Sequence, residues 1–421
     1  MTLSFSRKTI AALVFCGSIV SWGASAVAAD APQGIKVGQY HVEMASAGSG
    51  AYTVIFESGF SGGMADWQRV APDVAKSAKV VVYTRAGSGK SDPRPEARTP
   101  ERASLELDQL IEAAQLKPPF ILVGHSYGGY LIRLFAARHP DKVAGMVFVD
   151  PSMERFNTEL KKVDAGKLAQ DLRHVDSLTP AAFKAELKLV DEAFTAASRV
   201  PAPPLPDVPS VVLTSTMVRE KPEFFMHTVP AVNVWRRLHE QLFRQFSSGS
   251  HILTATSGHN IHMEEPALVS GAIEQVIASA TKLAKRRAHQ LARTSLMRSV
   301  DEAAVLLAAR RGAEAHSLMA AALKASQFSE NEVNKLGYDV LTRQPQVAVL
   351  VMKANTEAFA QSANAHDSYG EVLLGTRQPE LAKAQFLRAI ELGTGAGKGT
   401  RTMDGYRANL VKAEQALAAA K

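Results

Sequence analysis

From about residue 52 to residue 280, short apolar runs alternate with segments in which apolar residues recur at three- and four-residue spacing. Several of the short runs are continuously apolar, which is typical of strands buried on both faces of a parallel sheet, and the spaced segments predict amphipathic helices. This alternation predicts an α/β fold, in which a mostly parallel sheet is covered by helices on both faces. The expected strands are 52–57, 79–83, 120–124, 143–149, 208–214 and 251–254, and the expected helices are 67–78, 100–114, 130–138, 232–246 and 267–284.

Two insertions interrupt this alternation. Residues 151–206 contain helical patterns, notably 180–198, and end in a proline-rich stretch. We expect this insertion to form a cap over the carboxyl edge of the sheet. The second insertion, 217–230, holds Phe224, Phe225 and Met226, which either line a pocket or pack beneath the cap.

After about Ala284 the strand signal disappears and the chain becomes alanine-rich helix. Within residues 285–421, Arg343-Gln344-Pro345 recurs as Arg377-Gln378-Pro379, 34 residues later. Apolar and glycine positions around the two copies also correspond. A helix, turn, helix unit with this period resembles the tetratricopeptide repeat, a family whose units stack side by side. Two units are fewer than a free-standing stack needs, so we expect them to pack on the preceding helices or on the main domain.

The first 29 residues have the pattern of a secretory signal peptide: Arg7 and Lys8, an apolar run, and then small residues with cleavage expected after Ala28 or Ala29. A membrane anchor is the alternative, but the apolar run is shorter than the ~20 residues that span a bilayer. We therefore expect a periplasmic or secreted protein without a stable membrane anchor. Cys16 is the only cysteine, so the mature chain has no disulfide and no thiolate metal ligand.

The formal net charge of +7 becomes +5 when the two basic residues of the signal are removed. A cluster of basic residues remains between 282 and 298. It is interpreted as the solvated face of a helix rather than as a site for an acidic partner or an anionic membrane, because no aromatic residues interleave with it and no nucleic-acid motif is present.

Gly124-His125-Ser126-Tyr127-Gly128 follows the apolar run 120–123 directly. A serine between two glycines at the junction of a strand and a helix is the pattern of a nucleophile elbow, in which the serine hydroxyl is held at the tip of a sharp turn. Glycines are needed because the turn brings backbones together. The pattern predicts Ser126 as a nucleophile.

A serine needs a base, and Ser257-Gly258-His259 supplies one after the last expected strand. His259 is preferred over His262 because it comes first in that loop. His125 lies inside the elbow and is interpreted as a packed core residue. The histidines otherwise lack the spacing of metal ligands, so no metal or cofactor is expected.

The third catalytic part is a carboxylate that orients the histidine. The segment after the expected strand 208–214 contains no aspartate, whereas Asp150 ends the preceding strand at the same edge of the sheet. Asp150 is our first choice, followed by Glu220 and then Asp176 from the cap. An alternative role for Asp150 is that of a turn or helix-cap residue.

The oxyanion that forms during acyl transfer needs backbone N–H donors. Tyr127 supplies one by its position next to the nucleophile. Phe60, in the glycine-rich loop 57–63 after the first expected strand, is our choice for the second. A phosphate-binding loop is the rival interpretation, but the spacing of its glycines and lysine is absent.

Taken together, residues 50–280 resemble the α/β-hydrolase superfamily. The residues that carry the resemblance are Glu57-Ser58-Gly59-Phe60, Asp66-Trp67, residues 83–91, Val123-Gly124-His125-Ser126 and Ser257-Gly258-His259. Ser58 and Thr84 depart from the family pattern, which more often has histidine and aspartate there. The resemblance implies an α/β-hydrolase domain over 30–284 with its cap at about 151–206. Because the nucleophile is serine, the relatives that use aspartate on epoxides or haloalkanes are disfavoured.

These features predict an exported serine hydrolase that cleaves a small-molecule ester, or less readily an amide, through an acyl-enzyme on Ser126. The alternatives are an aminopeptidase or amidase of the same fold, and a non-catalytic scaffold that binds a protein partner through its C-terminal helices. No nucleic-acid partner is expected.

Overall fold

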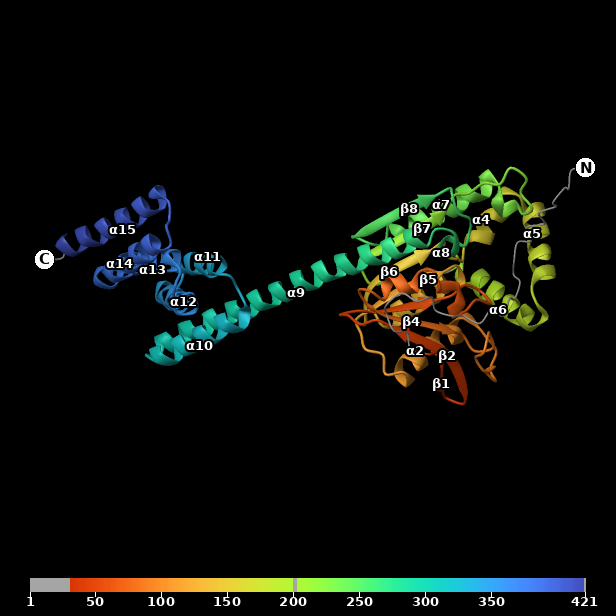
Figure 1. Cartoon of the computed structure of the whole chain (residues 1–421), viewed down its shortest axis with the longest axis horizontal. Helices are drawn as coiled ribbons and strands as arrows, with labels where there is room; N and C mark the ends of the chain where they lie inside the picture. Colours follow the sequence, from red (N-terminus) through yellow and green to blue (C-terminus); the bar gives the residue numbers. More distant parts are fainter. Residues whose placement is uncertain (1–30, 200–202, 420–421) are drawn as a thin grey trace, which may run out of the picture. The chain divides into compact units, whose positions relative to one another are not determined.

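The computed structural model describes residues 31–199 and 203–419, so the predicted signal peptide lies outside the described residues. The chain divides into two compact units, one ending at Lys282 and one formed by Leu283–Lys421. We call them unit 1 and unit 2 (Figure 1). Unit 1 contains both strands and helices, whereas the described part of unit 2 contains helices only, as predicted.

Unit 1 is built on one eight-stranded sheet with the order β1-β2-β4-β3-β5-β6-β7-β8. The strands from β4 to β8 in that order run parallel, and β2 pairs antiparallel with β4. This arrangement confirms the predicted α/β class. All six expected strands are present, with ends shifted by at most two residues: β3 (Thr53–Glu57), β4 (Lys79–Thr84), β5 (Phe120–His125), β6 (Val143–Val149), β7 (Ser210–Ser215) and β8 (Gly249–Thr254).

The sequence analysis missed a hairpin at the edge of the sheet, formed by β1 (Gln33–Val37) and β2 (Tyr40–Ala47). Gly38 has φ +58° and, with the next residue, makes the two-residue turn between them. Glycine at the first position of such a turn is typical of tight hairpins. β1 is mostly exposed, so its sequence lacks the continuous apolar run by which the inner strands were found.

Successive side chains of the inner strands enter two different cores, because alternate residues of a strand point to opposite faces of a sheet. Phe56 packs with Trp67 and Ile273 on one face, where the covering helices are η1 (Met64–Trp67), α1 (Ala71–Val74), α8 (Ile261–Glu264) and the first part of α9 (Pro266–Ala308). Ile55 packs with Leu107 on the other face, under α2 (Pro100–Ala113), α3 (Tyr127–Arg138) and α7 (Val229–Phe243).

One expected helix is wrong. Residues 67–78 contain only the last residue of the 3-10 turn η1 and the single α-helical turn α1 instead of a continuous helix. Pro72 is the physical reason, because proline has no N–H to donate and is tolerated only in the first turn of a helix. The apolar spacing of this segment arises from the burial of Trp67, Val70 and Val74 in the core.

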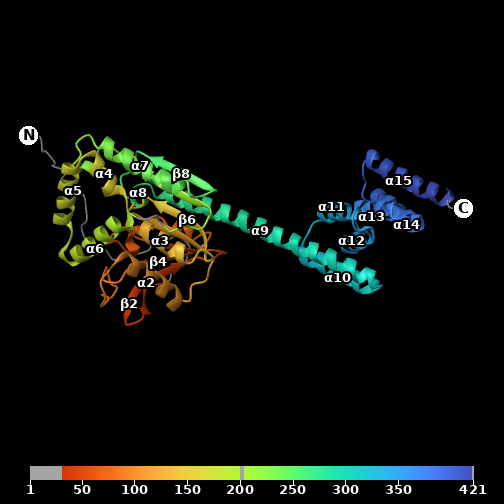
Figure 2. The ribbon, with the colours of Figure 1, turned by 180° about the vertical axis from the view of Figure 1, so that it is seen from behind.

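The insertion between β6 and β7 contains three helices, α4 (Phe156–Val163), α5 (Ala165–Leu178) and α6 (Ala181–Ala197). They lie together at one end of unit 1 (Figures 1 and 2). Asp164 ends α4 and caps α5, where its carboxylate accepts a hydrogen bond from the Lys167 N–H at 2.9 Å. A further 3-10 turn, η2 (Phe225–His227), follows β7.

Unit 2 contains the end of α9 and six further helices: α10 (Gly312–Ser326), α11 (Glu330–Leu341), α12 (Pro345–Ala358), α13 (Ala363–Gly375), α14 (Pro379–Gly395) and α15 (Thr400–Ala419). A Cβ atom at Gly337 would lie 2.5 Å from Met352, and one at Gly370 would lie 2.5 Å from Phe386. These two contacts correspond across the repeat seen in the sequence. The end of α9 and α10 share one core with α11–α14. Over the ranges 31–199 and 203–419, no helix has both the length and the apolarity to cross a bilayer.

Candidate active site

Ser126 lies at the sharp turn between β5 and α3, with φ +50° and ψ −120°. This conformation is strained for a residue with a side chain and costs on the order of 1–3 kcal/mol. The flanking glycines explain how the turn closes. A Cβ at Gly124 would lie 2.7 Å from the Gly128 carbonyl oxygen, and one at Gly128 would lie 2.2 Å from that of Glu57. Only hydrogen fits at either position, so the sequence pattern is a steric requirement of the turn.

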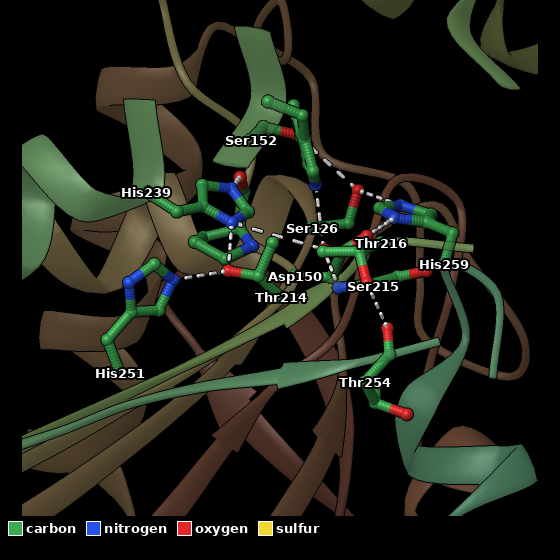
Figure 3. Close-up of polar contacts among 12 residues, drawn as sticks. Ser126, Asp150, Ser152, Thr214, Ser215, Thr216, His239, His251, Thr254 and His259 are labelled. Carbon is green, nitrogen blue, oxygen red and sulfur yellow. Dashed lines mark hydrogen bonds and ion pairs between the residues drawn. The ribbon is translucent and has the colours of Figure 1, made fainter. Parts of the chain in front are cut away.

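The structure brings Ser126, His259 and Asp150 together at the carboxyl edge of the sheet (Figure 3). His259 Nδ1 lies 2.6 Å from Asp150 Oδ2, and Nε2 lies 2.8 Å from Ser126 Oγ. Because an ionised carboxylate only accepts hydrogen bonds, Nδ1 carries the proton and Nε2 is free to accept from the serine hydroxyl. The Ser152 hydroxyl lies 3.4 Å from Ser126 Oγ on another side.

Asp150 follows the last residue of β6, is 2% exposed and has φ +45°. Its second oxygen, Oδ1, accepts hydrogen bonds from the backbone N–H of Ser215 at 2.9 Å and from Trp235 Nε1 at 2.7 Å. The first donor comes from the end of β7 and the second from α7. The carboxylate is therefore held on both oxygens, with Oδ2 directed at His259.

The two other acids considered from the sequence lie elsewhere. Glu220 is exposed after β7, and Asp176 on α5 forms an exposed ion pair with Lys184 at 3.1 Å. Neither has a hydrogen bond or ion pair with His259. Sequence reasoning missed Trp235 and the Ser215 N–H, because a single tryptophan on an amphipathic helix has no distinguishing pattern.

A second polar chain lies behind Asp150. His239 donates from Nε2 to the Pro151 carbonyl at 2.8 Å, and its Nδ1 lies 2.7 Å from Thr214 Oγ1, which also contacts His251 Nε2 at 2.9 Å (Figure 3). Burial lowers the pKa of His239 to about 4, so the ring is neutral near pH 7. The chain fixes the peptide that follows Asp150, and thereby the turn from which the carboxylate projects.

His262, the competing histidine, is buried and makes no hydrogen bond with Ser126. Neither ring nitrogen has a hydrogen-bond partner among the described residues. Burial, and secondarily the nearby His259, lowers the pKa of His262 to about 3. Its ring packs between Trp67, at 4.8 Å, and His125, at 4.2 Å between ring centroids. His125 is also buried, and its Nε2 lies 3.0 Å from the His259 carbonyl oxygen. Both rings support the loop that carries His259.

Phe60 and Tyr127 flank the nucleophile from different elements, the loop after β3 and the first turn of α3. Their rings lie 6.2 Å apart. Within the described residues, no acceptor is hydrogen-bonded to the backbone N–H of either residue. Two uncommitted N–H groups beside a serine nucleophile are what an oxyanion site requires.

Helix α6 of the cap packs over this region. Phe183 contacts the Phe60 ring at 6.0 Å, Phe194 contacts the Tyr130 ring at 4.8 Å, and Arg98 pairs with the buried Glu186 at 3.0 Å. The opposite face of α6 and the facing side of α5 line a cavity of about 720 Å³ that includes no residue of the triad. No group of three or more His, Cys, Asp or Glu side chains in the described ranges is arranged to hold a metal ion.

Comparison with known proteins agrees with this geometry. A family model described as alpha/beta hydrolase fold matches residues 52–179. The uncharacterized protein YqjL of Bacillus subtilis is 29% identical over 243 residues, which are 56% of this chain and 88% of that protein. An AB hydrolase superfamily protein of Gibberella zeae is 34% identical over 128 residues, 30% of this chain and 39% of that protein. Among solved structures, an esterase from Thermogutta terrifontis aligns with a TM-score of 0.43 and 17% identity, over 59% of this chain and 99% of that one.

The matched range begins just before β3 and includes the loop after it, the nucleophile elbow and the first two helices of the cap, α4 and α5. His259, the third member of the candidate triad, lies beyond the matched range, in the loop after β8. The family match therefore confirms the sequence resemblance over residues 52–179, where the chain is similar to proteins of the alpha/beta hydrolase fold.

Proposed function

We propose that this chain is an exported serine hydrolase that cleaves a carboxylic ester, or less readily an amide, through an acyl-enzyme on Ser126. The observation that carries the proposal is the unbroken series of hydrogen bonds from the Ser126 hydroxyl through His259 to Asp150. Such a series is what makes a serine hydroxyl nucleophilic near neutral pH.

In the acylation step, Ser126 Oγ attacks the substrate carbonyl carbon while His259 Nε2 takes its proton. The imidazole becomes positively charged, and the Asp150 carboxylate stabilises that charge and keeps the ring in place. His259 then gives the proton to the leaving alcohol as the tetrahedral intermediate collapses to the acyl-enzyme. In deacylation, water takes the place of the alcohol and gives a proton to His259, which returns it to Ser126 Oγ as the acid is released.

The negative oxygen of each tetrahedral intermediate would be stabilised by the N–H groups of Phe60 and Tyr127. One such donor contributes about a hundredfold to a thousandfold in kcat. A rigid backbone donor is effective because it needs no reorganisation during the reaction.

A fluorophosphonate probe tests this proposal on the full-length mature chain. We expect the wild type to be labelled and Ser126→Ala not to be labelled, with hydrolysis of p-nitrophenyl butyrate lost in the same variant. A folded wild type that neither reacts with the probe nor hydrolyses the ester would contradict the proposal. A parallel panel of amides and aminoacyl peptides separates an esterase from an amidase or aminopeptidase.

Export and a protein partner for unit 2 are further parts of the proposal. The signal-like segment 1–29 supports export, and cell fractionation of the natural host, followed by determination of the mature N-terminus, tests it. The corresponding Gly337–Met352 and Gly370–Phe386 contacts support two tetratricopeptide-like units. Affinity capture with the full chain, compared with a chain ending before Leu283, tests whether unit 2 retains a protein; equal capture by both chains would contradict that role.

A further inference from the structure

Arg85 follows β4, and its side chain contacts the loop that contains Phe60. Its guanidinium donates to Glu57 Oε1 at 2.5 Å, to the Ser58 carbonyl at 2.7 Å and to the Gly59 carbonyl. Arg85 is 6% exposed and Glu57 is fully buried. The planar fork of arginine can make these three bonds at once, which a lysine ammonium on its flexible stem does less well.

The carbonyl of Gly59 is fixed from two directions. It accepts from Arg85 and also from the Gly62 N–H at 3.2 Å. In a trans peptide the C=O and the following N–H point in opposite directions. Because the Gly59 carbonyl points toward Arg85, the Phe60 N–H points away from it.

The Gly59–Phe60 peptide lies beside the nucleophile. A Cβ at Gly59 would lie 3.5 Å from Ser126 Cβ and 2.9 Å from His125 Nδ1, so this peptide lies against the elbow. The start of α3 is equally close, since a Cβ at Gly128 would overlap the carbonyl oxygens of Glu57 and Ser58. The Arg85 guanidinium also lies 5.4 Å from the centre of the Tyr127 ring. Arg85 therefore contacts both segments that carry the uncommitted N–H groups.

We propose that Arg85 is a positioning residue that sets the oxyanion site, by holding the Ser58 and Gly59 carbonyls so that the Phe60 N–H faces the oxyanion. The proposal rests on the proposed ester hydrolysis at Ser126. A simpler role for Arg85 would be to neutralise the buried Glu57 carboxylate, and one hydrogen bond is enough for that. The other two of its three hydrogen bonds go to backbone carbonyls and therefore need another explanation. Removal of the Arg85 guanidinium would leave substrate binding unchanged and weaken binding of the tetrahedral intermediate.

The experiment uses Arg85→Lys, which keeps the charge, and the paired variant Arg85→Met with Glu57→Gln, which removes both charges together. The paired variant covers the outcome in which a single change leaves Glu57 unpaired and prevents folding. The measurements are kcat and KM for p-nitrophenyl butyrate and the inhibition constant of butylboronic acid, which forms a tetrahedral adduct on serine. We expect kcat to fall about a hundredfold, KM to change less than about threefold, and the boronic acid to bind more weakly by a similar factor to kcat.

Arg94→Met is the matched control. Arg94 is similarly buried and pairs with the buried Glu106 at 3.7 Å, but it does not contact residues 58–60. We expect a less stable enzyme with unchanged kcat and boronic acid affinity. Folded Arg85 variants with the wild-type kcat and inhibition constant, or with only KM raised, would overturn the positioning role and leave the proposed function intact. A wild type that is inert toward the ester and the fluorophosphonate would overturn both.

Discussion

The two units contain residues with the same unusual backbone conformation for different reasons. In unit 1, Ser61, Ser126 and Asp150 have φ between +45° and +55° and lie around the candidate active site, whereas Gln115, with φ +51°, lies just after the end of α2. In unit 2, Arg310 and Arg377 have φ near +60° and lie just after the ends of helices. A positive φ is common where a helix ends, and glycine usually occupies it. The same angle therefore indicates function only when the surrounding side chains also converge.

The two units also differ in how their buried side chains are arranged. In unit 1 both ring nitrogens of the buried His262 have no hydrogen-bond partner in the part of the chain that the structure describes, and this residue lies three positions after His259. Unit 2 instead has close packing of small against large residues, as at Gly370 and Phe386. Near the candidate site of unit 1 a buried polar ring therefore lacks a partner, whereas at Gly370 in unit 2 the absence of a side chain allows close contact with a large residue. Four predictions test this contrast.

Asp150→Asn has the largest expected effect. The amide can donate to His259 Nδ1 and so favour the wrong tautomer, which leaves no acceptor for the Ser126 proton. We expect kcat to fall about 10⁴-fold while the fold is retained. Ester hydrolysis measures the loss, and Asp176→Asn in the cap is the control. A near-normal rate would show that the Asp150 carboxylate, held at a residue with positive φ, is not the group that orients His259.

His262→Leu tests the cost of the buried histidine. The pKa of His262 is about 3 in the folded chain and about 6.5 when unfolded. Between these values the unfolded state binds more protons, so stability falls as pH falls. Relative to His262→Leu, the wild type should lose about 2 kcal/mol of unfolding free energy between pH 6.5 and pH 4.5.

Tryptophan fluorescence during denaturant unfolding makes this measurement specific to unit 1, because Trp67 and Trp235 lie there and residues 283–421 contain no tryptophan. Parallel stability profiles of the wild type and His262→Leu across this pH range would contradict the prediction.

Gly370→Ala tests the packing of unit 2. The new methyl group would lie 2.5 Å from the fully buried Phe386 ring, so we expect a loss of about 2 kcal/mol. Gly375→Ala, at the end of the same helix α13, is the control, because nothing lies within 4 Å of its added Cβ. There the change should stabilise the chain by up to about 1 kcal/mol, since alanine favours helix over glycine. Circular dichroism during thermal unfolding compares them, and equal effects would remove the packing argument.

The smallest expected effects compare the strained positions themselves. Ser126→Gly should be about 1 kcal/mol more stable than Ser126→Ala, and both should be inactive. Arg377→Gly should stabilise the chain by about 0.5 kcal/mol with full activity, because φ is +60° and glycine adopts it without strain. A less stable Arg377→Gly variant would contradict the interpretation that Arg377 only ends a helix and that its positive φ has no other role.

Much of unit 1 could be predicted because its signals are local. The glycines around Ser126 are a steric requirement of the turn, and the inner strands are continuously apolar because both faces are buried. The edge hairpin β1–β2 was missed because an exposed strand has a weaker pattern. Trp235 could not be predicted, because its bond to Asp150 joins residues 85 positions apart and depends on how α7 packs. Arg85 was visible in a motif, but its bonds to backbone carbonyls have no sequence signature.

The placement of the catalytic acid has a consequence for how this enzyme can be varied. Asp150 comes from β6, and the end of β7 contributes to it only a backbone N–H, which any residue except proline supplies. None of the hydrogen bonds of the triad involves residues 217–230. The exposed part of that segment, residues 218–223, is therefore open to insertion, deletion or replacement without loss of the catalytic carboxylate. It is the natural place to graft new loops when substrate preference is to be changed by laboratory evolution.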